Sequence, residues 1–391
     1  MAGGCVRDAL LGRSPKDYDV ATDATPESVR SVFGKSQTLA FGASFGVIGV
    51  LPPKGLKRND GKKLEPTEIA TFRSDGQYSD GRRPDSVHYG NAEQDALRRD
   101  FTINGLFYDP KSDSVVDFVG GQADLKRGVL QTIGDPVARF GEDKLRMLRA
   151  VRFATSLDFK IAEATHAAIV EHSGEIAMVS GERIGAEMRR VMQHPNALAG
   201  LNHLVQCKLH HAIMPELESA DWNRIERLMQ QKTQREFPIS LACVLASLAD
   251  AWAGLRAITN RWKLSNEETR IVGAAIKHWS IIAQAANLPW SQVQPRLIDR
   301  DAQAIWKLAA TIVEAEGHDD SGIRLTKDAL SWAPEKLDPP VLLSGDSLRE
   351  LGIAAGPQYK TILQAVRDAQ LNKQLETREE AIALAMKLTV S

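Results

Sequence analysis

The hydrophobic pattern of the chain changes its period near residue 136, and this change limits the folds that the chain can adopt. Before it, short runs rich in Val, Ile, Phe and Thr are typical of strands. After it, apolar residues recur at helical spacing and strand-like alternation is scarce. We therefore predict an α+β fold in which a sheet-containing part precedes an all-helical remainder. The expected strands lie at 17–22, 44–51, 67–72, 103–109 and 114–120.

Proline and glycine interrupt the helical pattern at "QHPNALAG", "NLPWSQVQP" and "WAPEKLDPPV". A chain of 391 residues can bury several hydrophobic cores, so more than one domain is expected. Together with the change of period, these breaks predict four domains, at 1–136, 137–195, 196–290 and 291–391.

Charge and apolar content exclude several classes of protein. The 49 basic residues balance 50 acidic ones, so any surface that attracts nucleic acid must be local. No apolar run reaches about 18 residues, and no signal segment is recognised, so we expect a soluble, cytoplasmic chain without membrane contact. Cys5, Cys207 and Cys243 are too scattered for a disulfide framework or a metal site, and we expect reduced thiols.

The first residues combine a glycine pair with two aspartates. Gly3 and Gly4 precede the helix-like "CVRDALLG", where backbone N–H groups can approach a phosphate. In "KDYDVAT", strand alternation would place Asp17 and Asp19 on one face. Two neighbouring carboxylates repel each other unless a hard cation such as Mg²⁺ lies beside them.

This combination predicts nucleotidyl transfer, with a hydroxyl attacking the α-phosphate of a nucleoside triphosphate beside two Mg²⁺ ions. Glu68, in an expected strand, could add a third carboxylate, although an exposed strand glutamate is an equally good interpretation. Taken singly, a glycine pair is more often an ordinary turn, and an Asp-x-Asp pattern is more often a solvated strand edge or loop.

The segment "RFGEDKLRMLRAVRFA" reads as one helix with Asp143, Arg146, Arg149 and Arg152 at every third position. Asp143 can only accept hydrogen bonds and Arg146 can only donate them. Cytosine and adenine present a donor beside an acceptor in the matching order, whereas guanine and uracil present the reverse. The alternative interpretation is an ordinary Asp143–Arg146 salt bridge within the helix.

Five motifs occur in a characteristic order: "GGCVRDALLGRSPKDYDVATDATPE", "EIATFRSDGQYSDGRRP", "RRDFTINGLFYDP", "GDPVARFGEDKLRMLRAVRFA" and "GERIGAEMRRVM". With them the chain resembles the class II tRNA nucleotidyltransferase and bacterial poly(A) polymerase family. The resemblance implies a polymerase-β-like nucleotidyltransferase head with a mixed sheet, followed by helical neck, body and tail domains. Relatives usually carry a further helix and strand before the glycine pair, and loss of that strand is expected to loosen the phosphate loop.

The resemblance also implies roles for individual residues. Asp17 and Asp19 would bind Mg²⁺ as the catalytic pair, Gly3, Gly4 and Arg7 would face the triphosphate, and Asp143 with Arg146 would read the base. The loop "SDGQYSDGRRPDSVHYG" would help the base site change from C to A. Residues expected to contact the nucleotide from the third and fourth motifs are Arg98, Arg99, Asp100, Asn104 and Arg149.

The activity that these roles imply is template-independent addition of CCA to the 3′ end of tRNA from CTP and ATP. The expected partner is the acceptor arm and elbow of tRNA, and no protein partner is evident. Alternatives are partial addition of A or CC, poly(A) synthesis, and a catalytically idle RNA-binding protein. Residues 191–391 hold 22 basic and 23 acidic residues, and this balance favours tRNA over the basic extension of a poly(A) polymerase.

Overall fold

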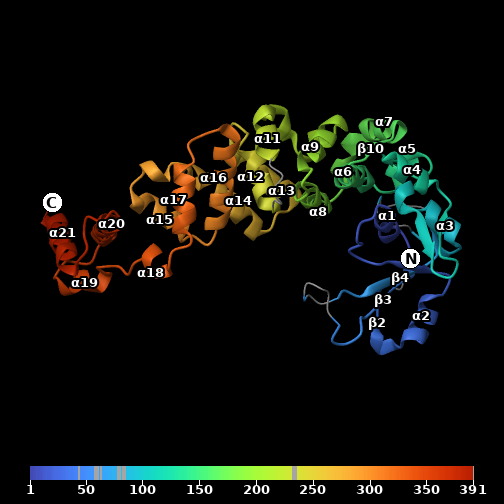
Figure 1. Ribbon diagram of the computed structural model, residues 1–391, viewed down its shortest axis with the longest axis horizontal. Coiled ribbons are helices and arrows are strands. Elements are labelled where there is room, and N and C mark those ends of the chain that lie inside the picture. Colours follow the sequence, from blue (N-terminus) through green and yellow to red (C-terminus); the bar gives the residue numbers. More distant parts are fainter. Residues whose placement is uncertain are drawn as a thin grey trace. The chain divides into compact units, whose positions relative to one another are not determined.

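The computed structural model describes residues 1–42, 45–56, 61, 64–76, 81, 85–230 and 236–390. The chain divides into two compact units, residues 1–215 and 216–391. The first contains the sheets, and in the second the described residues form helices and the loops that connect them (Figure 1). The predicted α+β fold is therefore confirmed, while the finer division at 136, 195 and 290 stays a prediction.

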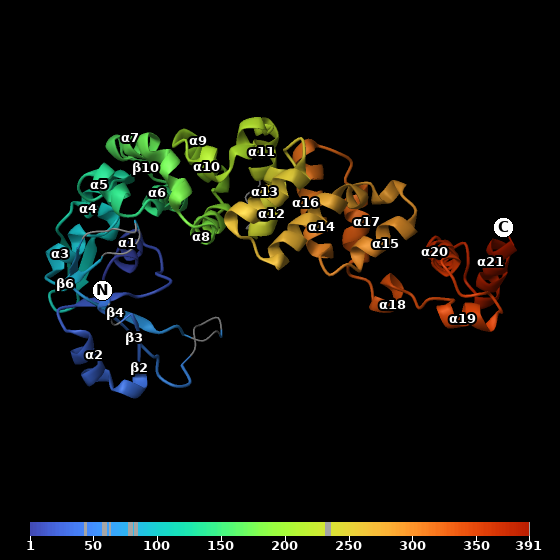
Figure 2. The same cartoon turned by 180° about the vertical axis from the view of Figure 1, so that it is seen from behind.

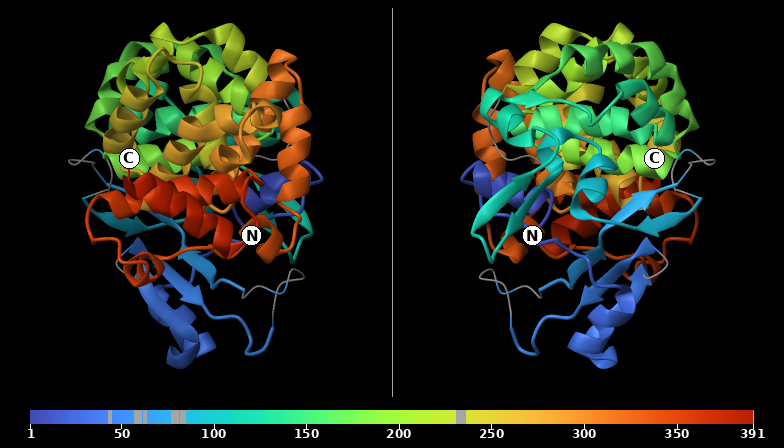
Figure 3. Two further views of the ribbon diagram at one scale, coloured as in Figure 1. Left: turned by 90° about the vertical axis from the view of Figure 1, so that its left-hand side faces the viewer. Right: turned by 90° about the vertical axis from the view of Figure 1, so that its right-hand side faces the viewer.

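The first unit is built on a mixed sheet of order β1-β4-β3-β2. Strands β1 and β4 are parallel with Val20 opposite Ile69, whereas β4 runs antiparallel to β3 with Ile69 opposite Ile48. Helix α2 packs against β3 and β4 (Figure 1, Figure 3). The strands are β1 Val20–Thr22, β2 Thr38–Gly42, β3 Val47–Val50, β4 Thr67–Thr71, β5 Arg73–Asp75, β6 Val87–Tyr89, β7 Leu106–Asp109, β8 Ser114–Asp117, β9 Val129–Leu130 and β10 Lys160–Ile161.

The first unit also contains helices between Gly4 and Ile213. Thr25 caps α2 by accepting a hydrogen bond from Ser28 N, and Pro26 occupies the first turn, where its missing N–H costs nothing. The helices are α1 Gly4–Leu10, α2 Pro26–Phe33, α3 Ala92–Leu97, α4 Gly121–Arg127, α5 Pro136–Glu142, α6 Leu145–Leu157, α7 Glu163–His172, α8 Gly181–Met192, α9 Ala197–Gln206 and α10 His210–Ile213, with 3₁₀ turns at Lys35–Gln37, Thr102–Asn104, Ser173–Met178 and Pro215–Ser219.

Two separate apolar clusters lie among the described residues of the second unit. One is formed around Ile282, Val293 and Ile305, and the other around Leu348, Ile362 and Val366. Figure 2 shows the helices of this unit from behind. The helices are α11 Trp222–Met229, α12 Phe237–Leu245, α13 Ala251–Trp262, α14 Asn266–Ala283, α15 Trp290–Leu297, α16 Ala302–Glu316, α17 Ser321–Ala329, α18 Pro334–Leu337, α19 Gly345–Glu350, α20 Gln358–Leu371 and α21 Arg378–Val390, with a 3₁₀ turn at Ala285–Asn287.

Two expectations about local structure are wrong. The first strand begins at Val20, so Asp17 and Asp19 precede it and strand alternation does not explain their placement. The expected single helix over "RFGEDKLRMLRAVRFA" is interrupted, because α5 ends at Glu142 and α6 begins at Leu145. Asp143 has extended dihedral angles at this break. The weakly patterned strands β2, β5, β6, β9 and β10 were not expected from the sequence.

The three cysteines are free and buried, as expected for reduced thiols. Burial raises the pKa of the Cys207 thiol to about 12, so this thiol stays protonated at neutral pH. In the part of the chain that the structure describes, no helix is both long and apolar enough to cross a membrane.

Candidate active site

A cavity of about 990 Å³ opens in the first unit and gathers most of the predicted site residues. Glu68 is not among the residues that line it. The predicted residues in its lining are Gly3, Gly4, Arg7, Asp17, Asp19, Arg98, Arg99, Asp100, Asn104, Asp143, Arg146 and Arg149. The lining residues that were not predicted are Phe45, Arg73, Asp75, Leu145, Arg152, Phe153, Arg183 and Arg190.

The first residues of the chain are held in place by backbone hydrogen bonds. Gly3 N donates to Leu106 O at 2.8 Å, and Tyr108 N donates to Met1 O at 2.9 Å, so this segment runs beside β7. Ala2 N donates to Asp19 O at 2.9 Å. These hydrogen bonds hold the glycine pair beside the aspartate segment at one wall of the cavity.

Gly3 has a backbone conformation that favours glycine, with φ of 71°. A Cβ atom at Gly3 would lie 2.6 Å from Nη1 of Arg99. Arg99 also donates from Nη1 to Asn104 O at 3.2 Å. Gly3 is therefore needed both for the turn into α1 and for the close approach of the Arg99 guanidinium.

We expect Gly3→Ala to raise the Kd for the predicted nucleoside triphosphate about tenfold, because a displaced Arg99 loses about one charged hydrogen bond to an anion. Titration of the purified variant with nucleoside triphosphates would measure this effect. The matched control is Gly12→Ala, since Gly12 has φ of 68° and nothing within 4 Å of its added Cβ. An equal rise in both variants would show that backbone strain, roughly 1–2 kcal/mol, explains the effect without Arg99.

The three acidic residues proposed for a cation lie close enough to affect one another. Parallel pairing of Val20 with Ile69 brings the preceding residues, Asp19 and Glu68, to the same end of two strands. Burial raises the pKa of Asp19, the positive charge of Arg99 opposes that rise, and the charge of Asp17 adds to it. Partial desolvation raises the pKa of Glu68 as well, and the charges of Asp19 and Asp17 raise it further.

This mutual repulsion is what a divalent cation would relieve, so the donor set fits Mg²⁺. Asp17 and Asp19 line the cavity and are the better pair. Glu68 is exposed. Among the described residues, Asp17, Asp19 and Glu68 do not offer three carboxylate oxygens that all lie within 4.8 Å of one another. Glu68 is therefore the weakest of the three predicted ligands.

The adjacent arginines after α3 share a buried carboxylate. Asp95 is only 1 % exposed, and its two oxygens accept hydrogen bonds from Nη2 of Arg98 at 2.6 Å and from Nη2 of Arg99 at 3.0 Å. The Arg99 guanidinium also lies 5.1 Å from the ring centre of Phe107. Asp95 therefore holds both guanidinium groups at the cavity wall.

Asp100 is the centre of a hydrogen-bond network that joins three elements. Its carboxylate accepts from Nη2 of Arg149 at 2.6 Å and from Nδ2 of Asn104 at 3.0 Å. Asn104 Oδ1 in turn accepts from Nη1 of Arg7 at 2.7 Å. Burial opposes ionisation of Asp100, but Arg149 and the hydrogen bonds outweigh it and lower the pKa from 3.8 to about 2. The network connects α6 to α1 through the 98–104 segment.

This depressed pKa predicts an acid-dependent contribution to stability. Because Asp100 ionises more readily in the folded chain, its contribution is present above about pH 4 and is lost as the pH falls towards 2. The difference in unfolding free energy between the wild type and Asp100→Asn should shrink by about 2 kcal/mol over this interval. Urea unfolding at pH 5 and at pH 2.5 would measure it, and a difference that is independent of pH would contradict it.

Asp143 and Arg146 both line the cavity but do not form the intrahelical salt bridge that was the alternative interpretation. Asp143 Oδ2 accepts from Nη2 of Arg183 in α8 at 2.7 Å, and its Oδ1 accepts from Leu145 N at 3.0 Å. Arg146 instead pairs with Glu142 and donates to Arg139 O at 3.1 Å. The interpretation as an Asp143–Arg146 salt bridge is therefore wrong.

The arginines of α8 are the main residues that the sequence analysis missed. Glu187 is buried at 4 % exposure and pairs with Arg152 and with Arg190, the latter at 3.3 Å. Arg183, Glu187 and Arg190 are spaced i, i+4 and i+7 in "GERIGAEMRRV", which places them on one helix face. That spacing was the available signal.

The segment proposed as a flexible loop, 74–90, is described only in part. Its ends belong to the β5–β6 hairpin, in which Arg73 pairs with Tyr89 and Asp75 with Val87. Arg73 and Asp75, at the two ends of β5, line the cavity. Residues 77–80 and 82–84 lie outside the described residues.

A mixed sheet that places paired aspartates and a glycine turn beside an arginine-rich cavity is the architecture of a nucleotidyltransferase. Residues 1–131 match the family "Poly A polymerase head domain", and residues 158–221 match "Probable RNA and SrmB- binding site of polymerase A". The chain is 31% identical over 386 residues to the CCA-adding enzyme of Geobacillus thermodenitrificans, covering 98% of this chain and 91% of that protein. The chain belongs to the CCA-adding enzyme family and is a nucleotidyltransferase.

Solved structures agree with this assignment. The Bacillus stearothermophilus CCA-adding enzyme in complex with CTP superposes with a TM-score of 0.73 at 27% identity, covering 99% of this chain and 92% of that chain. The Thermotoga maritima CCA-adding enzyme complexed with tRNA superposes with a TM-score of 0.62 at 20% identity, covering 99% of this chain and 90% of that chain. The latter similarity concerns the fold alone.

Proposed function

We propose that the chain adds the nucleotides C, C and A to the 3′ end of tRNA, using CTP and ATP. The observation that carries this proposal is the single cavity in which the aspartate pair and the Asp143–Arg146 pair both lie among arginines. Nine arginines and five aspartates line it, an excess of four positive charges that suits a triphosphate. The relatives and the CTP and tRNA complexes described above support the same substrates.

Each wall of the cavity has a proposed task. Gly3, Gly4 and Arg7 would bind the triphosphate, with Arg98 and Arg99 presenting guanidinium groups that Asp95 already orients. Asp17 and Asp19, and less directly Glu68, would hold Mg²⁺ beside it. When bound, Mg²⁺ would neutralise phosphate charge and lower the pKa of the attacking hydroxyl. The 3′-hydroxyl of the tRNA would give up its proton to solvent and form a bond to the α-phosphate, while the bond from the α-phosphorus to the oxygen that bridges to the β-phosphate breaks and pyrophosphate leaves.

Asp143 and Arg146 would select the base by presenting an acceptor beside a donor. Both side chains are engaged in the structure, Asp143 with Arg183 and Arg146 with Glu142. Those partners hold the two groups at the cavity wall, and their protein contacts must be shared or exchanged when a base enters. Arg149 extends from α6, as Arg146 does, and its guanidinium is held by Asp100. We expect Arg149 to face the nucleotide without reading the base.

The test is incorporation of labelled CTP or ATP by the purified chain with Mg²⁺. The substrates are three transcripts of one tRNA that lack all three, two or one of the terminal nucleotides. We expect two C and one A to be added in order, after which addition stops. A-only or C-only addition would instead indicate a partial enzyme, and an open-ended A tail would indicate a poly(A) polymerase.

The three buried free thiols suit a reducing compartment, which supports a cytoplasmic location.

A further inference from the structure

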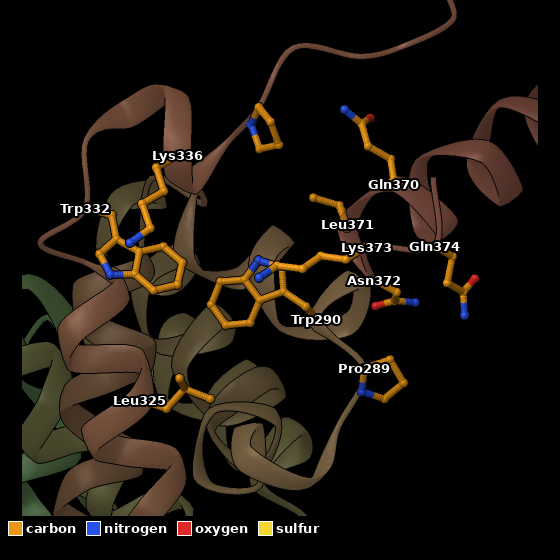
Figure 4. A pocket seen from close by; sticks show the side chains of 11 residues that line it. Pro289, Trp290, Leu325, Trp332, Lys336, Gln370, Leu371, Asn372, Lys373 and Gln374 are labelled. Atoms are coloured by element: carbon orange, nitrogen blue, oxygen red, sulfur yellow. The ribbon is translucent and has the colours of Figure 1, made fainter. Parts of the chain in front are cut away.

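A second cavity, of about 630 Å³, is lined by residues of the second unit, none of which lines the cavity described above. It is lined by the indoles of Trp290, at the start of α15, and Trp332, just after α17 (Figure 4). Their ring centres are 5.5 Å apart and their planes are inclined by 41°. Both indoles are half-buried, so each keeps part of its surface open. The volume is in the range of small-molecule sites, roughly 300–1,000 Å³.

Hydrogen bonds between distant segments shape the walls of this cavity. Ser291 N donates to Asn372 Oδ1 at 3.0 Å, and Asn372 Nδ2 donates to Ser291 Oγ at 3.1 Å. Between the lining residues Lys336 and Pro339, Asp338 Oδ1 accepts a hydrogen bond from Gln294 Nε2 at 2.8 Å. These contacts join α15 to the end of α20 and to the segment after α18. The cavity is therefore a built feature of the unit and not a gap between loosely placed helices.

The charged lining is entirely basic. Lys336 Nζ lies 4.1 Å from the ring centre of Trp332, and Lys373 extends into the cavity from the opposite wall (Figure 4). Neither lysine forms a salt bridge with a carboxylate among the described residues, and no described residue of the lining is acidic. Aromatic faces beside uncompensated ammonium groups suit a ligand that has both a flat ring and an anionic group.

We propose that this cavity binds a nucleotide, with the base on an indole face and the phosphate beside Lys336 and Lys373. The nucleotide comes from one of two sources, an unstacked residue of the RNA substrate or a free mononucleotide. The first source rests on the proposed function, and the second does not. Either source makes the cavity a nucleotide site separate from the Asp17 and Asp143 cavity.

The first experiment measures tRNA binding by the full chain as a function of salt concentration. For RNA as the source, the double variant Lys336→Ala/Lys373→Ala should raise the Kd about tenfold and reduce the salt slope by about two. The matched control is Lys277→Ala/Lys327→Ala, which removes two exposed lysines of the same unit that do not line the cavity. Equal weakening in both double variants would overturn the proposal in favour of general electrostatic attraction.

The tryptophan face is tested separately because Trp290 also packs against the apolar cluster around Val293. Trp290→Leu keeps an apolar side chain but removes the stacking surface, so the Kd should rise about fivefold or more. Trp290→Phe should restore most of the affinity. Thermal melting of both variants checks that the unit is folded, and equal affinities of two folded variants would contradict a stacking role.

The second experiment distinguishes the free nucleotide by equilibrium dialysis with AMP and CMP. A second bound nucleotide that disappears in the lysine double variant, with tRNA affinity unchanged, would identify a mononucleotide site. No second nucleotide together with unchanged tRNA affinity would overturn the proposal. If the wild-type chain fails to add CCA but its tRNA or nucleotide binding still depends on these lysines, the proposed function fails and the cavity assignment stands.

Discussion

Replacing Asp17 with alanine is expected to lower nucleotide transfer about a thousandfold or more at every position of the CCA sequence. Asp17 lines the cavity beside Asp19, whose pKa its charge helps to raise. Removing one carboxylate of the pair removes a ligand for the cation that neutralises the triphosphate, an effect of several kcal/mol in the transition state. Single-turnover incorporation of labelled CMP and AMP would measure the loss.

The matched control for Asp17→Ala is Asp23→Ala. Asp23 is an exposed acid just after β1 and does not line the cavity, so this variant changes the net charge by the same amount. It should keep wild-type transfer, and both variants should bind tRNA with unchanged affinity. Loss of transfer by less than about tenfold in Asp17→Ala would contradict the assignment of the aspartate pair to catalysis.

Replacing Asp143 with alanine is expected to relax the choice of base while leaving transfer measurable. Asp143 supplies the only acceptor of the proposed base-reading pair, and a bidentate contact of this kind discriminates by about 1–3 kcal/mol. The ratio of kcat/KM for CTP over UTP should therefore fall roughly ten- to hundredfold. Competition between labelled nucleotides on one tRNA transcript would measure the ratio.

Arg183 gives this prediction a second variant. Since Arg183 donates to Asp143 Oδ2 at 2.7 Å, Arg183→Ala should relax selectivity in the same direction by mobilising Asp143, and Arg183→Lys should recover part of it. Asp158→Asn is the matched control, because Asp158 is an exposed acid at the opposite end of α6. Its left-handed conformation also suits asparagine. Unchanged selectivity in Asp143→Ala would refute the base-reading role.

The order of the motifs was sufficient to identify the family, and local patterns were sufficient to separate a sheet-containing part from a helical remainder. Local pattern was less reliable for the aspartate pair. Asp17 and Asp19 precede β1, and the hydrogen bond from Ala2 N to Asp19 O, together with the register of β1 against β4, determines their position. The composition of "KDYDVAT" predicted a strand that includes both aspartates, but only Val20 to Thr22 form one.

Chemical character and local periodicity were therefore determined by the sequence alone. They include which residues can carry a charge, form hydrogen bonds to a nucleotide base or form a turn, and where along the chain helices replace strands. The tertiary structure decided which of these groups meet. Asp100 pairs with Arg149, 49 residues away, and Asp143 pairs with Arg183, 40 residues away, instead of with its neighbour Arg146. Local spacing predicts neighbours only within one unbroken helix. Once α5 ends and α6 begins beside Asp143, the packing of α8 against α6 determines its partner.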